Sequence, residues 1–147
     1  MSVMDAEAII ELLQLEPHPE GGRYRQTWRA PAGAGERAAG SAIYFLLRRG
    51  EVSLWHRVDA AETWHFYEGA PLELRVSADG ENEQVVGLGP DLAADQRPQF
   101  VVPAGAWQSA RSLGEHTLVG CTVSPAFELD GFEVAEPGWC PGRRSTG

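Results

Sequence analysis

The sequence predicts an all-β domain, a barrel or sandwich of short strands preceded by one short helix. The length of 147 residues suits a single compact domain with one core. Short apolar runs separated by Gly, Pro and Asp recur from about residue 22 to residue 134, a spacing typical of a barrel or sandwich. We therefore expect one domain over residues 1–136, with a helix at about 3–15, a barrel at about 22–134 and a tail at 137–147.

The helix is predicted by its capping residues and its apolar spacing. Ser2 is followed three residues later by Asp5, and apolar residues then recur at helical spacing until Pro17 ends the helix. The strands are expected at 23–29, 41–47, 52–58, 62–67, 72–76, 84–88, 99–102, 107–111, 117–123 and 127–134. The Gly- and Pro-containing segments 31–40 and 90–98 are expected to be mobile loops, and the tail is expected to be loose because it lacks apolar periodicity.

Composition and charge exclude several classes of protein. No apolar run approaches the length of a membrane span, and the first residues lack the pattern of a secretory signal, so we expect a cytoplasmic protein without membrane contact. The net charge of -9 disfavours nucleic acid as a partner. All 12 basic residues are arginine, which rules out Schiff-base lysine chemistry. Cys121 and Cys140 fit neither a disulfide framework nor a zinc pattern and are expected to be free thiols.

Residues 50–69 concentrate side chains that can bind a metal ion or move a proton. Alternation along a strand places Leu54, His56 and Val58 on one face, and a turn brings His56 opposite Glu62 on the next strand. Imidazole changes charge near neutral pH, and burial raises the pKa of a carboxyl group. A histidine beside a glutamate in an aromatic-lined pocket therefore suits either metal binding or proton transfer.

The same stretch resembles the first motif of the cupin superfamily, G-x5-H-x-H-x3–4-E-x6-G. Gly50, His56, Glu62 and Gly69 stand at the positions of this motif, and Val58 replaces its second histidine. A complete cupin site uses three histidines and a glutamate and usually holds iron, manganese, nickel or zinc. The first motif is therefore matched with one of its metal ligands missing.

A second motif follows at a plausible separation. Residues 103–108, PAGAWQ, resemble the cupin motif P-x-G-x2-H, with Gln108 where the third histidine belongs and with Arg97 and Ser112 in place of the flanking glycine and asparagine. Further similarity, from HPEGGRYRQTWR to TLVGCTVSPAFELDGFEVA, is to a small single-domain cupin family whose members mostly lack an assigned activity. That resemblance implies a double-stranded β-helix, the jelly-roll barrel, in a homodimer with one pocket at an end of the barrel. It also implies a shape akin to that of the dTDP-sugar epimerases.

The first function that we consider is that of an isomerase, epimerase or lyase that works without a tightly held metal on a sugar or another small polar metabolite. His56 would be the base and Glu62 would orient it, while Tyr44, or Tyr24 at the edge of the pocket, would supply a proton on the opposite face. Arg25 would anchor a carboxylate or phosphate of the substrate through its planar guanidinium group.

Further residues are candidates for the lining of the same pocket. Thr27 alternates onto the face of Arg25, Trp64 and Phe66 could stack on a planar or sugar ligand, and Gln108 completes the candidate substrate-binding set. Each also has an ordinary structural explanation. Arginines on an edge strand are commonly solvated, and aromatic residues at strand spacing are commonly core residues.

Two other functions stay open. A metal-dependent oxygenase or hydrolase would use His56, Glu62 and Gln108 with waters, but an amide oxygen is a poor ligand and Val58 supplies none, so at most a weakly bound divalent metal is expected. A non-catalytic module would hold a metabolite in the same pocket for sensing or storage. The missing histidines motivate this second alternative.

Overall fold

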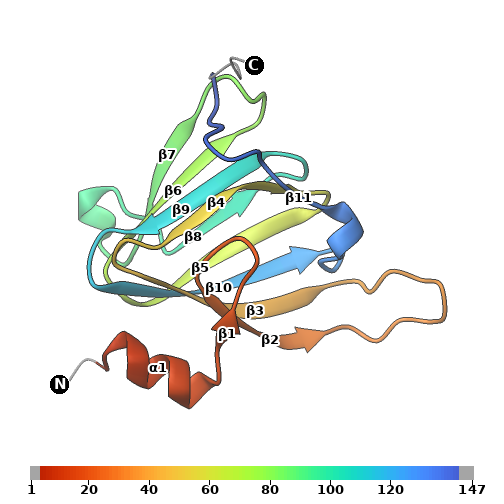
Figure 1. The fold of residues 1–147 in the computed structure, drawn as a ribbon, viewed down its shortest axis with the longest axis horizontal. Helices are drawn as coiled ribbons and strands as arrows, with labels where there is room; N and C mark the ends of the chain where they lie inside the picture. Colours follow the sequence, from red (N-terminus) through yellow and green to blue (C-terminus); the bar gives the residue numbers. More distant parts are fainter. Residues whose placement is uncertain (1–3, 143–147) are drawn as a thin grey trace.

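The computed structural model describes residues 4–142, in which two antiparallel sheets face each other and form a barrel (Figure 1). The strands of the first sheet lie in the order β1 (Glu16–Pro17), β2 (Arg23–Arg29), β3 (Ser41–Arg48), β10 (His116–Ser124), β5 (Ala61–Gly69) and β8 (Gln99–Val102). Those of the second lie in the order β11 (Phe132–Val134), β4 (Val52–Val58), β9 (Trp107–Ser112), β6 (Leu72–Ser77) and β7 (Gln84–Leu88). Consecutive strands mostly alternate between the sheets, which confirms the predicted jelly-roll barrel.

One α-helix, α1 (Ala6–Leu13), covers the outer face of the first sheet (Figure 1). Its Ile9 is buried against Leu46 of β3. The Asp5 side chain accepts a hydrogen bond from a backbone N–H of the first turn at 2.8 Å and is therefore the N-cap. The helix is shorter than predicted, and Ser2 lies outside the described residues. Within the described part of the chain, no helix has the length and apolar character needed to cross a membrane.

The observed strands agree with the predicted ones to within about two residues, except for the last strand. Leu129–Gly131 forms a short 3-10 helix, so only Phe132–Val134 of the predicted strand 127–134 pairs in a sheet. The loop 31–40 joins β2 to β3 and projects from the barrel in Figure 1, and Leu92–Ala94 forms a second 3-10 helix.

The tail was expected to be loose, but part of it packs against the barrel. Trp139 packs on the outer side of the second sheet, with its ring centroid 4.7 Å from that of Trp107 and 5.9 Å from that of Trp55. An aromatic contact of this kind anchors the segment 137–142 to the barrel. Residues 143–147 of the predicted tail lie outside the part of the chain that the structure describes.

Bulges in two strands change which side chains face the interior. In β2 the register shifts between Gln26 and Trp28, and in β4 it shifts between Ser53 and His56. The bulge in β4 allows Ser53 and His56 both to be buried and turns Leu54 outward, where it is 51% exposed. Strict alternation, which predicted Leu54 on the face of His56, is therefore wrong at this position.

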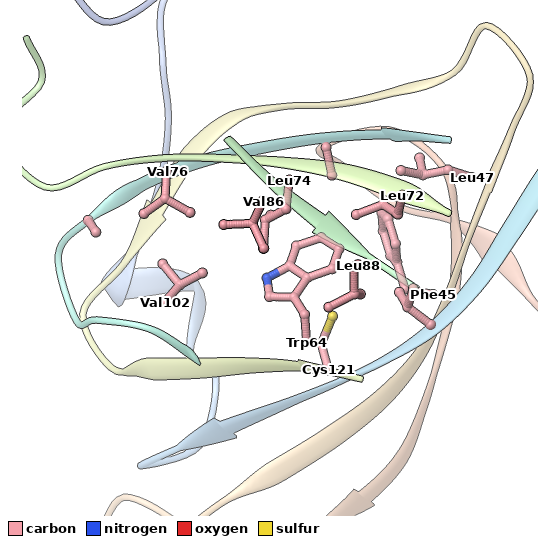
Figure 2. Packing of buried hydrophobic residues seen from close by; sticks show 13 residues of the cluster. Phe45, Leu47, Trp64, Leu72, Leu74, Val76, Val86, Leu88, Val102 and Cys121 are labelled. Carbon is pink, nitrogen blue, oxygen red and sulfur yellow. The ribbon is translucent and has the colours of Figure 1, made fainter. Parts of the chain in front are cut away.

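Apolar side chains fill one part of the barrel interior (Figure 2). Within this cluster Phe45 and Trp64 meet edge to face, with their ring centroids 6.0 Å apart. Around them lie Leu47, Leu72, Leu74, Val76, Val86, Leu88, Val102 and Val119. Close packing of this kind supplies most of the free energy that stabilises a small barrel. It occupies only part of the interior, and the remainder holds a cavity.

Candidate functional site

A cavity of about 680 Å³ occupies the part of the barrel interior that the apolar core leaves open. Its inner wall carries the buried residues Glu20, His56, Glu62 and Cys121. Its outer part carries the charged residues Glu16, Arg29, Glu128 and Asp130. His56 and Glu62 thus line one enclosed space, as alternation across the hairpin predicts.

The inner wall depends on the loop 18–22, whose sequence is HPEGG. The Leu54 N–H donates a hydrogen bond to the Glu20 carbonyl oxygen at 2.8 Å, which ties the loop to β4. Gly21 has a φ of +107°, and a Cβ atom there would lie 2.3 Å from the Val52 carbonyl oxygen. Only glycine permits this close approach. The loop therefore lies against β4 and carries the Glu20 side chain into the cavity.

Glu20 and His56 form a close polar pair. Oε2 of Glu20 lies 3.1 Å from Nε2 of His56, and the Ser53 hydroxyl donates to Oε1 at 2.9 Å. Nδ1 of His56 donates to the Leu54 carbonyl oxygen at 2.7 Å, which leaves Nε2 as the acceptor in the neutral ring. Burial raises the pKa of Glu20 to about 8 and lowers the pKa of His56. Both shifts favour the uncharged forms, so at neutral pH the pair is neutral rather than ionic.

Glu62 is positioned by a chain of hydrogen bonds that begins in the apolar core. The Trp64 indole N–H donates to Oε1 of Gln108 at 2.7 Å, and Nε2 of Gln108 donates to Oε1 of Glu62 at 2.8 Å. An indole nitrogen can only donate, so this chain has one direction. Burial raises the pKa of Glu62 to about 7, with His56 and Gln108 opposing the rise and Glu20 adding to it. Glu62 therefore changes charge near neutral pH while it is buried in the wall of the cavity.

His18 presents an unused N–H donor to the cavity. Its side chain is 9% exposed, and its ring packs edge-on against Tyr24 with a centroid distance of 4.5 Å. Its Nδ1 accepts a hydrogen bond from the Glu20 backbone N–H at 3.0 Å, so the neutral ring carries its hydrogen on Nε2. Burial, assisted by His56, lowers the pKa of His18 to about 4 and keeps the ring neutral. Among residues 4–142, none accepts a hydrogen bond from this Nε2–H.

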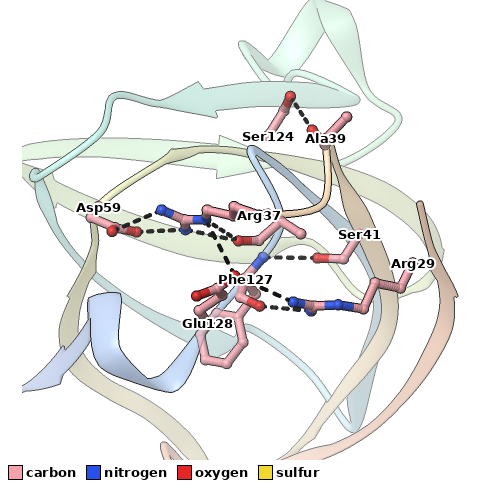
Figure 3. A network of polar contacts seen from close by, with 9 residues as sticks. Arg29, Arg37, Ala39, Ser41, Asp59, Ser124, Phe127 and Glu128 are labelled. Carbon is pink, nitrogen blue, oxygen red and sulfur yellow. Dashed lines mark hydrogen bonds and ion pairs between the residues drawn. The ribbon is translucent and has the colours of Figure 1, made fainter. Parts of the chain in front are cut away.

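Two arginines brace the outer part of the cavity (Figure 3). The Arg29 guanidinium group donates to the Phe127 carbonyl oxygen at 2.8 Å and lies 3.6 Å from the Glu128 carboxylate. Arg37 makes two hydrogen bonds to the carboxylate of Asp59, at 2.8 and 2.9 Å. Both guanidinium groups thus have acceptors within the protein, and they hold the loops that surround the opening.

The arginine that was predicted to reach the substrate lies outside the cavity. Arg25 is exposed and donates to the Gln14 side chain at 2.9 Å, and Thr27 on the same face bonds to a carbonyl oxygen of β3. The inward face of β2 carries Tyr24 instead, because its ring packs toward the barrel interior. The bulge farther along β2 then turns Arg29 toward the cavity.

The predicted aromatic residues also lie elsewhere. Tyr44 packs with Leu46 beneath α1 on the outer face of β3, so it does not reach the cavity. Tyr24, considered as its alternative, does line the cavity. Trp64 is buried in the apolar core and Phe66 packs against that core, so neither forms a stacking platform for a ligand. Both are therefore residues of the core, which is the alternative explanation given for them above.

The predicted metal ligands do not present a suitable donor set. His56 directs Nε2 to Glu20 and Nδ1 to a backbone carbonyl oxygen, and Gln108 gives its amide oxygen to Trp64. Across residues 4–142, no group of three or more His, Cys, Asp or Glu side chains is arranged to hold a metal ion. The ligand set that a cupin metal site needs is therefore not offered by these residues.

Glu20 and His18 are two residues of the cavity to which the sequence analysis assigned no role. A signal for them exists in the two consecutive glycines that follow, because Gly21 and Gly22 both have positive φ and both lie close to neighbouring backbone. Such glycines mark a loop that packs tightly on another strand. Polar residues beside a loop of this kind are candidates for burial.

Comparison with protein families and solved structures agrees with this architecture. The family model described as Cupin superfamily (DUF985) matches residues 7–135. A structural-genomics protein from Shewanella oneidensis is 41% identical, with a TM-score of 0.87, and the match covers 91% of this chain and 86% of that one. A hypothetical protein from Leishmania major is 31% identical, with a TM-score of 0.84 and coverage of 92% and 90%.

A more distant match shows the fold alone. Oxalate decarboxylase from Bacillus subtilis is 12% identical, with a TM-score of 0.62, and the match covers 80% of this chain and 29% of that enzyme. Comparison with curated protein sequences found no match. The predicted homodimer, small-molecule ligand and cytoplasmic location are tested by none of these comparisons and stay predictions.

Proposed function

The chain belongs to the cupin superfamily, in the family described as DUF985, and on that premise we propose that it is a metal-independent isomerase or epimerase acting on a small polar metabolite. The observation that carries the proposal is Glu62, a buried carboxyl group in the cavity whose pKa is raised to about 7. A group with such a pKa can both accept and return a proton at neutral pH. Proton transfer at a carbon next to a carbonyl group is the reaction class that this property suits.

Glu62 is the base in this proposal, and His56 is a positioning residue. Both ring nitrogens of His56 are engaged, one by the Leu54 carbonyl oxygen and the other by Glu20. The lone pair of the neutral ring, on Nε2, therefore faces Glu20. This reverses the roles predicted from the sequence, in which His56 was the base and Glu62 oriented it.

The proposed reaction needs no oxidant, reductant or other co-reactant. The Glu62 carboxylate takes a proton from the carbon next to the carbonyl group, the C–H electron pair forms the C=C bond of an enolate, and the carbonyl oxygen gains the negative charge. Tyr24 and His18 line the same cavity and can donate hydrogen bonds to that oxygen. Donation of a proton from the opposite face to the same carbon, for which Tyr24 is the candidate, gives an epimer, and exchange with water then returns a proton to the tyrosine and removes one from Glu62. Return of the proton from Glu62 to the neighbouring carbon, with a proton shift between the two oxygens, gives an isomer.

Exchange of carbon-bound hydrogen for solvent deuterium tests the proposal. The protein is incubated in deuterium oxide with a panel of aldoses, ketoses, sugar phosphates and nucleotide-linked sugars, and exchange is followed by proton NMR. We expect the wild type to exchange one carbon-bound hydrogen of at least one member, and Glu62→Gln to be slower by about 100-fold or more. The introduced glutamine can still accept the hydrogen bond from Gln108, so the fold should be retained.

The matched control is Glu68→Gln, the same substitution on the same strand. Glu68 lies outside the cavity and contacts His116 at 3.2 Å. This variant should exchange at the wild-type rate. Equal exchange by wild type and Glu62→Gln would refute the role of Glu62. Thermal stabilisation by a member of the panel without any exchange would favour the non-catalytic binding module.

A further inference from the structure

We propose that the cavity binds an uncharged polyhydroxylated aldehyde or ketone, such as a free ketose, and rejects the phosphorylated and nucleotide-linked forms of the same compound. This inference rests on the proposed function, because it names the substrate class of the same site. It differs from the sequence-based expectation that Arg25 anchors a negative charge. Two independent observations support it: the charge of the outer part of the cavity, and the unused donor within.

The outer part of the cavity repels anions. Glu16, Glu128 and Asp130 line it, and Arg29 is the one arginine among the described lining residues. The Arg29 guanidinium group is already directed to the Phe127 carbonyl oxygen and to Glu128. A phosphate group entering here would meet carboxylates without a free cation to pair with, and like charges brought together in a site reduce affinity strongly.

The inner part of the cavity is suited to bind an uncharged hydrogen-bond acceptor. The Nε2–H of His18 has no acceptor in the described chain, and its side chain is 9% exposed. No side-chain nitrogen or oxygen that is fully buried in the described chain lacks a partner, so this nitrogen keeps some exposed surface, and His18 is one of the residues that line the cavity. A donor left without an acceptor in a closed site weakens binding.

A carbonyl oxygen satisfies this donor better than the alternatives. An ammonium group has no lone pair to accept from His18, whereas a carbonyl oxygen has two. Glu20 and Glu62 supply polar atoms on the same inner wall, which suits the hydroxyl groups of a sugar. The oxygen that accepts from His18 is also the one that gains charge when Glu62 removes the neighbouring proton, so binding and the proposed chemistry require the same placement.

Three related compounds test the substrate class. D-xylulose is an uncharged ketose, xylitol is its reduced form without the carbonyl group, and D-xylulose 5-phosphate carries the same carbon chain with an added phosphate. Binding to the wild-type protein is measured by saturation-transfer NMR and isothermal titration. We expect D-xylulose to bind about fivefold more tightly than xylitol, the effect of one hydrogen bond. We expect it to bind at least about tenfold more tightly than the phosphate.

His18→Asn tests the inner contact. An asparagine side-chain oxygen can replace Nδ1 as the acceptor for the Glu20 N–H, but asparagine is too short to replace the Nε2–H donor in the cavity. The preference for D-xylulose over xylitol should therefore disappear, while the melting temperature stays near that of the wild type. His18→Gln is the companion variant, since its amide N–H extends to the position of Nε2, and it should recover part of the preference.

Glu16→Gln combined with Asp130→Asn tests the outer charge. Both residues are exposed, so the double variant should fold normally. Removing two negative charges should improve binding of D-xylulose 5-phosphate several-fold and leave D-xylulose unchanged. This variant keeps the test valid even if substitution at His18 disturbs the loop.

The outcomes separate the substrate class from the function. Tighter binding of the phosphate than of D-xylulose overturns the substrate class, as does a failure of D-xylulose, D-fructose and D-ribulose all to bind at millimolar concentration. Tighter binding of an amino sugar than of the matching neutral sugar also overturns it. Binding of D-xylulose with the expected preferences, but without deuterium exchange of any uncharged ketose, upholds the substrate class and refutes the proposed isomerase or epimerase activity.

Discussion

In one part of the barrel interior the inward-facing side chains include Phe45 and Trp64, whereas in the other they include Glu20, His56 and Glu62. The same strands supply both parts, since β5 carries Glu62 and, two residues later, Trp64. In the first part the residues bury apolar area, and in the second they bury carboxyl and imidazole groups that must satisfy one another. The comparison shows that the strands alone do not make the cavity, because Glu20 enters from the loop before β2.

Gln108 joins the two parts. It accepts from Trp64 on the apolar side and donates to Glu62 on the polar side. Both the oxygen and the nitrogen of the Gln108 amide group thus have partners within the protein, and the orientation of Glu62 depends on the packing of an indole ring. The rigidity of the apolar part therefore extends to the group that we propose as the base.

The largest expected effect comes from breaking the apolar part. Trp64→Ala removes the largest fully buried side chain and also the donor to Gln108. Unfolding in guanidinium chloride should show a loss of about 3–5 kcal/mol of stability. The control is Trp28→Ala, since Trp28 is 53% exposed and its removal should cost less than about 1 kcal/mol. Similar losses in both variants would contradict the division of the interior described above.

A smaller effect is expected from displacing the loop that completes the polar part. In Gly21→Ala the new Cβ would lie 2.3 Å from the Val52 carbonyl oxygen, at a φ of +107°, so the loop must move. We expect a loss of about 3 kcal/mol in stability together with loss of ligand binding. Gly35→Ala is the matched control, because Gly35 also has a positive φ, of +79°, but has no atom within 4 Å of the added Cβ.

The control variant should lose only about 1 kcal/mol, the cost of the backbone conformation itself, and should bind ligand normally. The difference between the two variants isolates the close contact between the loop and β4. If Gly21→Ala were as stable as Gly35→Ala and still bound ligand, the tight fit of the loop would not be needed to place Glu20.

The sequence predicts most of the fold, because the strands alternate in polarity and two spaced motifs resemble those of cupins. Predictions fail where one extra residue enters a strand. The bulge in β4 turns Leu54 outward, and the bulge in β2 turns Arg29 inward. A bulge hardly changes the pattern of polar and apolar residues in the sequence, so a prediction from strict alternation misses it.

The cavity was predicted less completely than the fold. His56 and Glu62 were found by their spacing, whereas Glu20, the direct partner of His56, lies 36 positions earlier in the chain. Contacts between residues so distant in the chain depend on the loop path, which local patterns do not encode. The placement of Tyr44 in the pocket was wrong for a related reason. Both faces of β3 are covered, one by the barrel interior and the other by α1, so the sequence pattern does not show which face of β3 points inward.

The smallest expected effect is a dependence of stability on pH. It comes from the ionisable side chains of the polar part, and the apolar part contributes nothing to it. Burial raises the pKa of Glu20 to about 8 and of Glu62 to about 7, from an ordinary value of 4.5. From pH 4.5 up to the raised pKa of each group, the folded protein binds more protons than the unfolded chain. Their favourable contribution is therefore complete below pH 4.5 and is lost as the pH rises through 7 and 8.

Histidines act in the opposite direction but at lower pH. Burial lowers the pKa of His18 to about 4 and also lowers that of His56, so their effect on stability is confined to pH values below about 6.5. Between pH 6.5 and 8.5 the carboxyl groups dominate. Stability from denaturant unfolding should therefore fall across this range by roughly 1 kcal/mol per pH unit through Glu20, and by less than half of that through Glu62, which is mostly ionised above pH 7.

Glu20→Gln sharpens this prediction, because glutamine reproduces the protonated acid. Its amide oxygen can accept from the Ser53 hydroxyl, and its amide N–H can donate to Nε2 of His56, while it carries no charge at any pH. Because the unfolded wild type already loses this proton above pH 4.5, the variant should be more stable than the wild type at pH 6.5 and by a wider margin at pH 8.5, whereas Glu68→Gln, outside the cavity, should keep the wild-type slope. A wild type whose stability does not fall over this range would show that the inner carboxyl groups ionise without cost, and it would remove the reason for treating Glu62 as a base poised near neutral pH.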